Sequence, residues 1–364
     1  MKNFYLKTFR PISGLLLLAS FTTSVYAVNV TNTGAVVTSM SAAPTVVASL
    51  HEDALSERLE AGRLSSADNG GVWISYFGGV SRNTPELDRY AAHGNFNLYS
   101  NGVIIGGDTF IDADNGHWLA GLAVSTAKSN LTTRGHKNSD IDIIQKNEGD
   151  IKSYSVHGYL SRQYDNGVFI DTSLGFYHLK NSARIRDLGE KDAPVDYSLN
   201  GFGGAVKVGY QHLNSSGLFA EPYVKLSAMT FENNDYDIIV NDSIYSQAAT
   251  ISNDSLNSVL GEIGGKLGMK FPIQNAEISP YIKVALTNEF AGGNRINVFS
   301  VDYETAEASH QSVRSKIDGA AARMGAGVQA SLTKNAGAYA QLSYLKGEHR
   351  EEPLQGVMGI NLTW

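Results

Sequence analysis

The chain has no cysteine among its 364 residues, which excludes a disulfide framework and a thiolate metal site. Basic residues are not in excess, since 29 lysines and arginines stand against 36 acidic residues, and this balance argues against a nucleic-acid partner. Long apolar runs are missing apart from one short stretch near the N-terminus, which excludes a bundle of transmembrane helices. The motifs G-x-S-x-G, H-E-x-x-H and G-x-x-x-x-G-K-S/T are absent as well, so the sequence predicts no enzyme, no metal site and no cofactor.

The residues that are abundant favour β-structure. Glycine is frequent at 37 residues, proline is rare at 8, and the chain holds 18 tyrosines and 14 phenylalanines. Such a composition is typical of a β-rich protein with many tight turns and with aromatic belts.

The one apolar stretch lies at the N-terminus and predicts a secretory signal peptide over residues 1–27. Lys2, Lys7 and Arg10 precede the apolar segment Ile12–Phe21, which is too short to span a bilayer. The small Ala27 and an acceptable Val25 then stand at positions −1 and −3 of a cleavage site. We expect cleavage after Ala27 and export from the cytoplasm. An uncleaved membrane anchor is the alternative.

Residues 28–49 form a polar tail that carries no charge and no clear periodicity. Beyond this tail, apolar residues recur at helical spacing from Leu50 to Leu64, with acidic residues early and arginines late, as the helix dipole favours. The sequence therefore predicts a short amphipathic helix within residues 50–66, with Leu55 and Leu59 on its apolar face.

From Gly70 onward the helical period gives way to apolar residues at every second position, the period of a β-strand. Twelve such segments follow, at approximately 71–80, 95–110, 117–130, 151–164, 167–183, 200–213, 217–231, 257–271, 277–291, 318–332, 337–347 and 355–364. The links between them alternate between long ones, such as 131–150, and short ones, such as Asp165–Gly167. Outer-membrane β-barrels show this asymmetry between long extracellular loops and tight periplasmic turns.

The polar face of these segments carries charges in one strand after another. The charges expected to face a barrel lumen are Lys207, Glu221, Lys225, Glu262, Lys266, Lys283 and Arg323. A soluble β-sandwich also alternates, but its dry core could not hold so many charges. A wide, wet lumen would hold them at little cost, either as a channel lining or as partners of the helix. The apolar face would then meet lipid.

The chain ends on the strand pattern LQGVMGINLTW, in which Met358, Ile360, Leu362 and Trp364 alternate with smaller or more polar residues. A terminal strand with one apolar face must be paired if it is not to aggregate. We therefore expect it to be the last strand of a barrel, with Trp364 at a membrane interface.

Three segments together resemble the C-terminal translocator domain of pertactin-like autotransporters. They are GGVWISYFGG (Gly70–Gly79) after the helical pattern, GAAARMGAGVQASLTKNAGAYAQLSYLKG (Gly319–Gly347) and the closing strand. The resemblance implies an all-β fold over residues 70–364, a twelve-stranded antiparallel transmembrane barrel with the N-terminal amphipathic helix in its lumen. Leu55, Arg58, Leu59 and Arg63 would belong to this plug helix.

The resemblance also implies a function, a location and a set of partners. The barrel would insert in the outer membrane and export or display the segment N-terminal to it by type V secretion. Met358, Ile360, Leu362 and Trp364 would be its signal to the barrel-assembly machinery, with periplasmic chaperones, outer-membrane lipid and no nucleic acid as partners, and the barrel would be monomeric. The tail of about 22 residues would be a vestigial passenger. No Asn-Asn pair, which some relatives use for self-cleavage, occurs in 50–64.

Two other functions stay open. The long loops would make the protein a surface adhesin or interaction barrel. Catalytic loop residues would make it an outer-membrane hydrolase, although no motif supports one.

Overall fold

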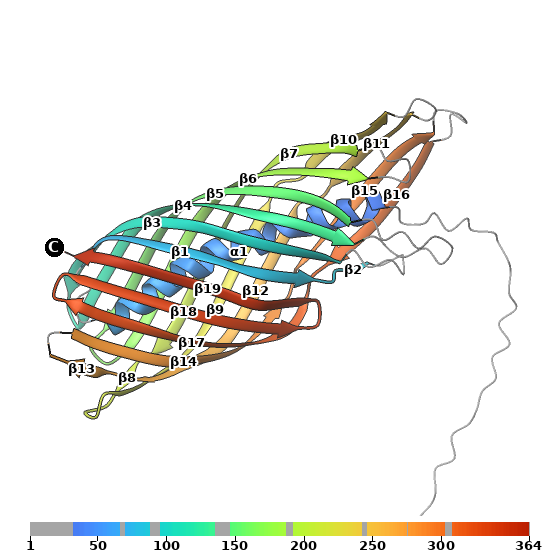
Figure 1. Ribbon diagram of the computed structural model, residues 1–364. Coiled ribbons are helices and arrows are strands. Elements are labelled where there is room, and N and C mark those ends of the chain that lie inside the picture. Colours follow the sequence, from blue (N-terminus) through green and yellow to red (C-terminus); the bar gives the residue numbers. More distant parts are fainter. Residues whose placement is uncertain are drawn as a thin grey trace, which may run out of the picture.

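The computed structural model describes residues 32–65, 70–87, 95–134, 146–186, 192–241, 246–274, 276–302 and 308–363. The expected signal peptide, the start of the polar tail and Trp364 lie outside these residues. One closed antiparallel barrel of twelve strands surrounds a single long helix (Figure 1).

The twelve expected segments correspond to the twelve barrel strands, most of which extend beyond the expected bounds. In order around the barrel they are β1 (Gly70–Asn83), β3 (Phe96–Ala113), β4 (Gly116–Arg134), β5 (Lys146–Tyr164), β6 (Val168–Arg186), β7 (Asp192–Tyr210), β9 (Leu218–Phe231), β12 (Leu256–Met269), β14 (Ala276–Glu289), β17 (Gly319–Thr333), β18 (Ala336–Gly347) and β19 (Arg350–Thr363). Each strand pairs with the next along the chain, so the sheet is built from hairpins.

The barrel closes between its first and last strands. β1 and β19 pair antiparallel from Gly71 opposite Thr363 to Asn83 opposite Arg350, with an irregularity between Val80 and Arg82. The terminal strand is therefore paired on both sides, and no open edge remains between the first and last strands.

Residues on β19 alternate between the two faces as the sequence predicts. The side chains of Met358, Ile360 and Leu362 are 57%, 51% and 53% exposed on the outer surface, whereas Val357 and Asn361 are buried on the inner surface. The same alternation recurs around the barrel and leaves an outer belt of exposed aliphatic and aromatic side chains. In an outer-membrane barrel this belt meets lipid.

The short turns use residues that the sequence makes suitable. Gly167 ends the turn between β5 and β6 with a φ of 91°, where a Cβ would lie 2.3 Å from the Gln211 carbonyl oxygen. In the turn between β8 (His212–Leu213) and β9, the Asn214 side chain accepts hydrogen bonds from the backbone N–H groups of Ser216 and Leu218. Both devices are common in tight turns.

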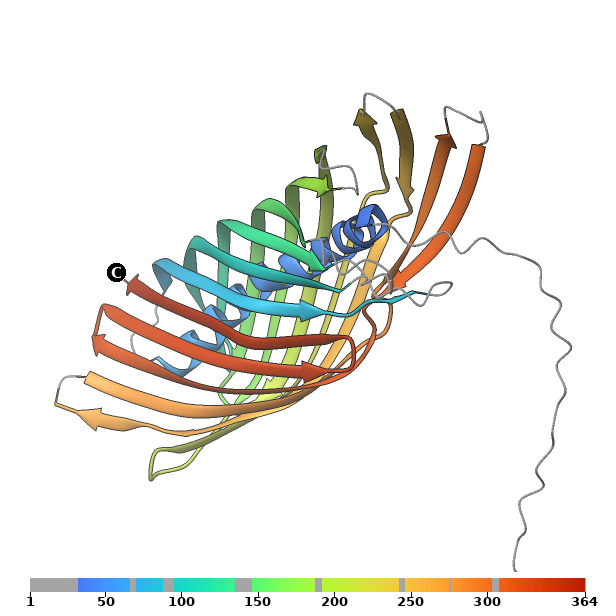
Figure 2. The ribbon, with the colours of Figure 1, turned by 45° about the vertical axis from the view of Figure 1, so that its right-hand side comes forward.

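The helix α1 (Asn32–Leu64) is longer than the sequence predicts, and the expected tail 28–49 is helical from Asn32 onward. It runs through the lumen and is enclosed by the strands (Figure 2). Its N-terminal half has no polar stripe because it is buried on all sides: Val36, Val37, Val46 and Val47 are at most 3% exposed. A helix buried all round needs no amphipathic period. Within the described chain, α1 is not apolar enough over a sufficient length to cross a membrane.

Pro44 lies inside α1 and has no N–H to donate to the carbonyl of Met40, one turn earlier. The hydroxyl of Tyr197, on β7, donates a hydrogen bond of 3.1 Å to that carbonyl. The barrel wall thus replaces the bond that the proline removes, and the helix continues through this position.

Two long links contain strands that the sequence analysis treats as loops. The link 232–256 holds β10 (Asn234–Asn241) and β11 (Ser246–Asn253), and the link 292–317 holds β15 (Gly293–Asp302) and β16 (Ala308–Lys316). These hairpins extend beyond the barrel at the end where α1 begins, and β11 pairs with β15 (Figure 2). Two shorter pieces complete the sheet, β2 (Glu86–Leu87) on β16 and β13 (Phe271–Ile273) on β14.

Candidate functional site: the helix-filled lumen

The C-terminal half of α1 carries acidic and basic side chains that meet charges of the opposite sign on the barrel wall. Glu60 forms ion pairs with Lys207 on β7, Lys266 on β12 and Lys283 on β14. Its carboxylate oxygens lie 3.0 and 3.2 Å from the Lys283 ammonium nitrogen. Glu57 accepts a further hydrogen bond of 2.8 Å from Lys283. All five side chains are buried, so each ion pair is largely screened from solvent.

The wall around Glu60 carries an excess of positive charge, because Glu221 and Glu262 on β9 and β12 face four lysines. Lys266 lies directly opposite Lys283 in the register of β12 and β14, and Lys207 lies directly opposite Lys225 in that of β7 and β9. Like charges at directly opposed positions destabilise a sheet. The carboxylate of Glu60 compensates this repulsion, because it contacts three of these four lysines.

Asp53 fixes the helix about two turns before Glu60, nearer to the end of the barrel that carries the long links. One of its carboxylate oxygens lies 3.5 Å from the Lys225 ammonium, and the other accepts a bond of 3.1 Å from Arg323 and one of 3.2 Å from Gln355. Arg323 also lies 3.7 Å from Glu352 on β19. The acidic side of α1 therefore faces the wall from β7 to β19.

The basic side of α1 meets acids elsewhere on the wall. Arg58 donates to Asp108 on β3 at 3.1 Å. Asp108 also accepts a 2.9 Å bond from Tyr159, whose hydroxyl accepts the indole N–H of Trp73 at 2.8 Å. The cation of Arg58 lies 5.8 Å from the centre of the Trp73 ring. This group of four joins α1 to the wall formed by β1, β3 and β5.

Arg63, in the last turn of α1, holds the short-turn end. It donates to Asp171 on β6 at 2.5 Å and to Glu221 on β9 at 3.0 Å, and its guanidinium lies 3.8 Å from the centre of the Phe169 ring. Lys270 donates a 2.9 Å bond to the carbonyl of Leu64. The C-terminus of α1 is thus fixed beside the short turns.

Nearer the middle of α1, His51 and Glu52 contact hydroxyl groups. The two ring nitrogens of His51 lie 2.6 Å from the hydroxyl oxygen of Ser125 and 2.8 Å from that of Ser153. Ser173 donates to Glu52 at 2.8 Å. These hydroxyl groups belong to β4, β5 and β6, so the middle of the helix packs against this part of the wall.

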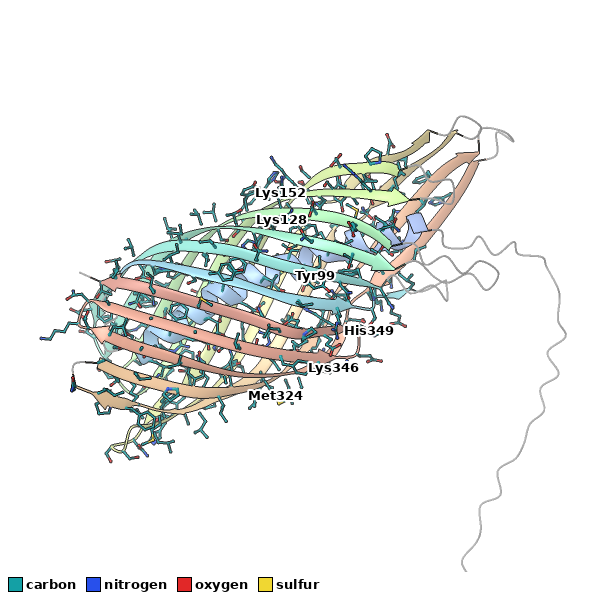
Figure 3. The ribbon with its side chains drawn as sticks, in the orientation of Figure 1. Tyr99, Lys128, Lys152, Met324, Lys346 and His349 are labelled. Atoms are coloured by element: carbon teal, nitrogen blue, oxygen red, sulfur yellow. The ribbon has the colours of Figure 1, made fainter. Side chains whose placement is uncertain are left out.

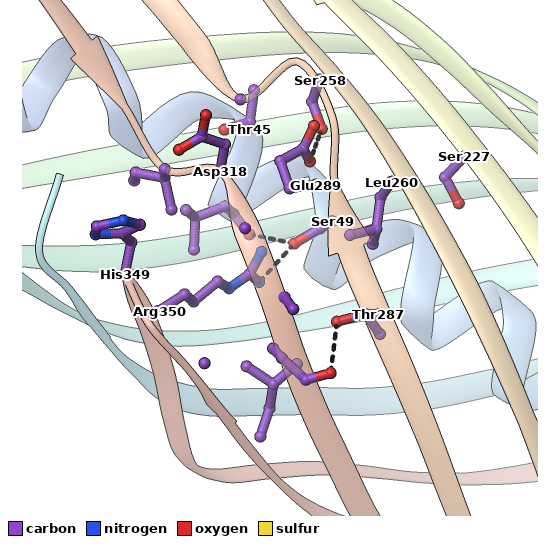
Figure 4. Close-up of a pocket in the computed structure, with 18 of the residues that line it drawn as sticks. Thr45, Ser49, Ser227, Ser258, Leu260, Thr287, Glu289, Asp318, His349 and Arg350 are labelled. Atoms are coloured by element: carbon purple, nitrogen blue, oxygen red, sulfur yellow. Dashed lines mark hydrogen bonds between the residues drawn. The ribbon is translucent and has the colours of Figure 1, made fainter. Parts of the chain in front are cut away.

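A small pocket of about 60 Å³ lies on the other side of α1, towards β9, β12, β14 and β17 (Figure 4). Arg350 crosses it and donates a 3.0 Å bond to Ser49 of the helix. Glu86, Asp318 and His349 place their ligand atoms within 4.8 Å of one another and could hold a metal ion, although Lys316 already lies 3.7 Å from Asp318.

The residues expected at this site occupy the following positions. Of the seven expected wall charges, Lys207, Lys225, Lys266, Lys283 and Arg323 pair with acids of α1, Glu221 pairs with Arg63, and Glu262 instead accepts a 2.7 Å bond from Tyr223. Arg58 and Arg63 make the pairs described above, and Leu55 and Leu59 are buried against the wall. Met358, Ile360 and Leu362 lie on the outer surface, away from the lumen.

The expected helix is present in the lumen, and the expected charges other than Glu262 are its partners and not a channel lining. Only the expected width and wetness of the lumen are corrected, because α1 fills it at this level and Lys207, Glu221, Lys266 and Lys283 are at most 5% exposed. The acids Asp108 and Asp171 were not singled out, although each falls on the inward phase of its strand's alternation, which is the signal that could have found them.

Comparisons with known proteins are consistent with each other. A family model described as "Autotransporter beta-domain" matches residues 72–343. The uncharacterized protein YaiT of Salmonella typhimurium is 28% identical over 329 residues, which are 90% of this chain and 30% of that protein. The pertactin autotransporter of Bordetella bronchiseptica is 24% identical over 314 residues, 86% of this chain and 31% of that protein. The chain therefore spans less than a third of the length of either relative.

Two solved structures share the fold. The β domain of the Bordetella autotransporter BrkA aligns with a TM-score of 0.60 and 20% identity, covering 82% of this chain and 100% of that one. The transport unit of the autotransporter AIDA-I from Escherichia coli aligns with a TM-score of 0.56 and 15% identity, covering 81% of this chain and 90% of that one.

Proposed function

This chain belongs to the autotransporter β-domain family, and from this membership we propose that it exports to, or displays at, the cell surface the segment that precedes α1. The chain is an outer-membrane barrel of the type V secretion class. Its work would be noncovalent: the strands provide a path across the membrane, and α1 occupies that path.

One observation carries the proposal, namely the direction of α1. Its C-terminus is held by Lys270 beside the short turns. At the opposite end Ser41 donates to Asn253 on β11, and Tyr197 donates to Met40, so the N-terminal half lies beside the long links. In outer-membrane barrels short turns face the periplasm and long loops face the outside. The chain therefore enters the lumen from the periplasmic end and leaves towards the cell surface.

The distribution of charge along α1 supports a defined position at which the exported chain stops in the lumen. Residues 28–50 carry no charged side chain, so this part of the chain finds no ion-pair partner as it passes the wall lysines. When Glu60 reaches Lys207, Lys266 and Lys283, several buried pairs form together. We propose that these pairs stop the chain and leave α1 as a plug.

The experiment places an epitope tag directly before Asn32 and tests whether protease added to intact cells removes it. We expect removal, because the tag would lie outside the cell. A control tag in the turn 334–335 between β17 and β18 should stay protected until the outer membrane is opened. Equal protection of both tags would contradict the proposed direction. Conductance of the purified barrel in a planar bilayer should rise when residues 32–64 are deleted.

The mature protein would reach the outer membrane by further steps that we also propose. The peptide 1–27 would be cleaved, periplasmic chaperones would carry the unfolded chain, and the strand ending in Met358, Ile360, Leu362 and Trp364 would be read by the barrel-assembly machinery. The closure of β19 on β1 supports this order, because the last strand must be present before the barrel closes. The inserted barrel would be a monomer.

A second function, adhesion, is favoured by the hairpins beyond the barrel. The pairing of β11 with β15 joins β10, β11, β15 and β16 into one ordered surface at the long-link end. We propose that this surface contacts environmental partners. Exchange of the hairpin 234–253 for a short turn should abolish adhesion of expressing cells while leaving membrane insertion unchanged; adhesion retained in the variant would exclude this role.

A further inference from the structure

Three lysines stand in one row on the outer surface of the barrel. Lys128 on β4 lies directly opposite Lys152 on β5, which lies directly opposite Lys180 on β6. All three side chains are exposed, and they share the outward phase of their strands with the exposed Val124 and Val156. Figure 3 shows Lys128 and Lys152 projecting from neighbouring strands, away from the lumen.

The row lies at the edge of the apolar belt that is nearer to the long links. About ten residues separate Lys128 from Trp118 on the same face of β4, which is roughly 33 Å along the strand and roughly 25 Å along the axis at a tilt near 40°. An apolar band in such barrels is about 25 Å tall. Next to the lysines, on the side of the belt, the rings of Tyr154 and His178 lie 6.4 Å apart. Aromatic girdles mark the membrane boundary.

Only one of the three lysines has an ion-pair partner among the described residues. Lys128 has one ion pair, at 3.4 Å with Asp150, and both side chains are about half exposed. Within the described residues, Lys152 and Lys180 have no acid within ion-pair distance. Lysines directly opposite one another repel. Since neighbouring strands lie about 4.8 Å apart, three positive charges fall within about 10 Å.

A second exposed cluster, on β18, β19 and β1, shows how the protein itself can supply an anion. There Lys346 on β18 and Arg82 on β1 lie 3.3 and 3.6 Å from Glu351 on β19. That exposed cluster has its own carboxylate between the two cations. Among the described residues, Lys152 and Lys180 lack such a bridge, so these two lysines are open to an anion from outside the chain.

We propose that the lysine row (Lys128, Lys152 and Lys180) binds the phosphate groups of a glycolipid in the outer leaflet of the outer membrane. The location selects a lipid, because the ammonium groups lie where headgroups begin and the exposed Val124, Val156 and Phe176 lie below them, where acyl chains pack. The charge selects phosphate, because a headgroup with two phosphates can bridge lysines on adjacent strands. The inference depends on the outer-membrane location and not on the export of any segment.

The test titrates the folded full-length protein in detergent with bis-phosphorylated lipid A and, in parallel, with dephosphorylated lipid A, and counts bound lipid by native mass spectrometry. We compare Lys152→Gln and the triple variant K128Q/K152Q/K180Q with the wild type. Lys346→Gln is the matched control, because it removes one exposed cation from a different part of the outer surface, on β18. We expect affinity to fall about fivefold for each lysine and about a hundredfold for the triple variant. The control should change by less than about twofold, since Lys346 lies outside the row and its charge is bridged by Glu351.

Three results would overturn the proposal. The triple variant could bind as tightly as the wild type, dephosphorylated lipid A could bind as well as the bis-phosphorylated form, or millimolar inorganic phosphate could displace the lipid and so show that the row takes free phosphate. Heat-modifiable gel mobility reports whether each variant is folded. If the triple variant does not fold, Lys152→Gln alone decides, and unchanged binding to it refutes the lysine row as a lipid site.

Discussion

Replacing Glu60 by glutamine tests whether α1 is held by buried charge. Glutamine keeps the volume of the side chain and one carbonyl acceptor but removes the negative charge. Lys283 would keep Glu57 at 2.8 Å, whereas Lys207 and Lys266 would lose the carboxylate with which they pair. Two buried ammonium groups would then remain without an ion-pair partner within the described residues.

The structure indicates a large effect. Removing one partner of a buried ion pair typically costs about 3–5 kcal/mol, because the other charge stays buried. We therefore expect Glu60→Gln to lower the free energy of unfolding by at least about 3 kcal/mol. Adding Lys266→Gln to this variant should restore part of the loss, because it removes one unpaired charge and the repulsion with Lys283 across β12 and β14.

The assay is equilibrium unfolding in urea of barrels inserted in lipid vesicles, followed by the shift in gel mobility of unheated samples. Asp150→Asn is the control, because it breaks the half-exposed pair with Lys128 and should change the free energy of unfolding by less than about 1 kcal/mol. If Glu60→Gln cost no more than this control, water would have to solvate the lysines. The interpretation of a helix locked by buried charge would then be wrong.

Three further changes test the facing of the strands, the assembly signal and the helix. Val284→Arg places a charge on the outer surface, where the Val284 side chain is 56% exposed, and should lower the free energy of unfolding in vesicles by about 2–4 kcal/mol near the bilayer midplane. Lys283→Arg keeps its buried charge and should cost less. Equal costs would mean that the assignment of the two faces is wrong. Deleting Trp364 should lower the amount of heat-modifiable barrel in outer-membrane fractions, and an unchanged yield would argue against an assembly signal. Tyr197→Phe leaves the Met40 carbonyl without its donor and should cost about 1–3 kcal/mol in the same unfolding measurement, with no loss expected if water can reach that carbonyl.

The strands could be predicted because a barrel imposes two simple rules on its sequence. Each strand must alternate between lipid and lumen, and its ends must meet long and short links in turn. Met358, Ile360 and Leu362 obey the first rule. The hairpins beyond the barrel follow the same rule over a shorter length: the buried Tyr236 and Ile238 on β10 alternate with aspartates. That signal was present in the sequence, but the length of the link 232–256 favoured a loop.

The first half of α1 could not be predicted because its residues favour no helix by themselves. Threonine, valine and serine have modest helix propensities, and Pro44 removes a backbone donor. The helix forms here because the lumen buries its apolar side chains on all sides and Tyr197 supplies the missing donor. Both conditions come from the tertiary structure, which a local pattern does not contain.

The pairing of charges raises the same difficulty at a larger scale. Alternation places Lys207, Lys266 and Lys283 inside the barrel, but it does not state what they meet, because this depends on the height and rotation of α1 within the closed wall. The register supplies the missing constraint. Lys266 faces Lys283 on one side and Glu221 on the other, so the wall presents Lys207, Lys225, Lys266 and Lys283 against Glu221 and Glu262. This local excess of positive charge favours an anion in the lumen at that level, and Glu60 is placed there. On the outer surface Lys152 lies opposite Lys128 in the same way, and there we propose that the anion comes from lipid phosphate in the membrane.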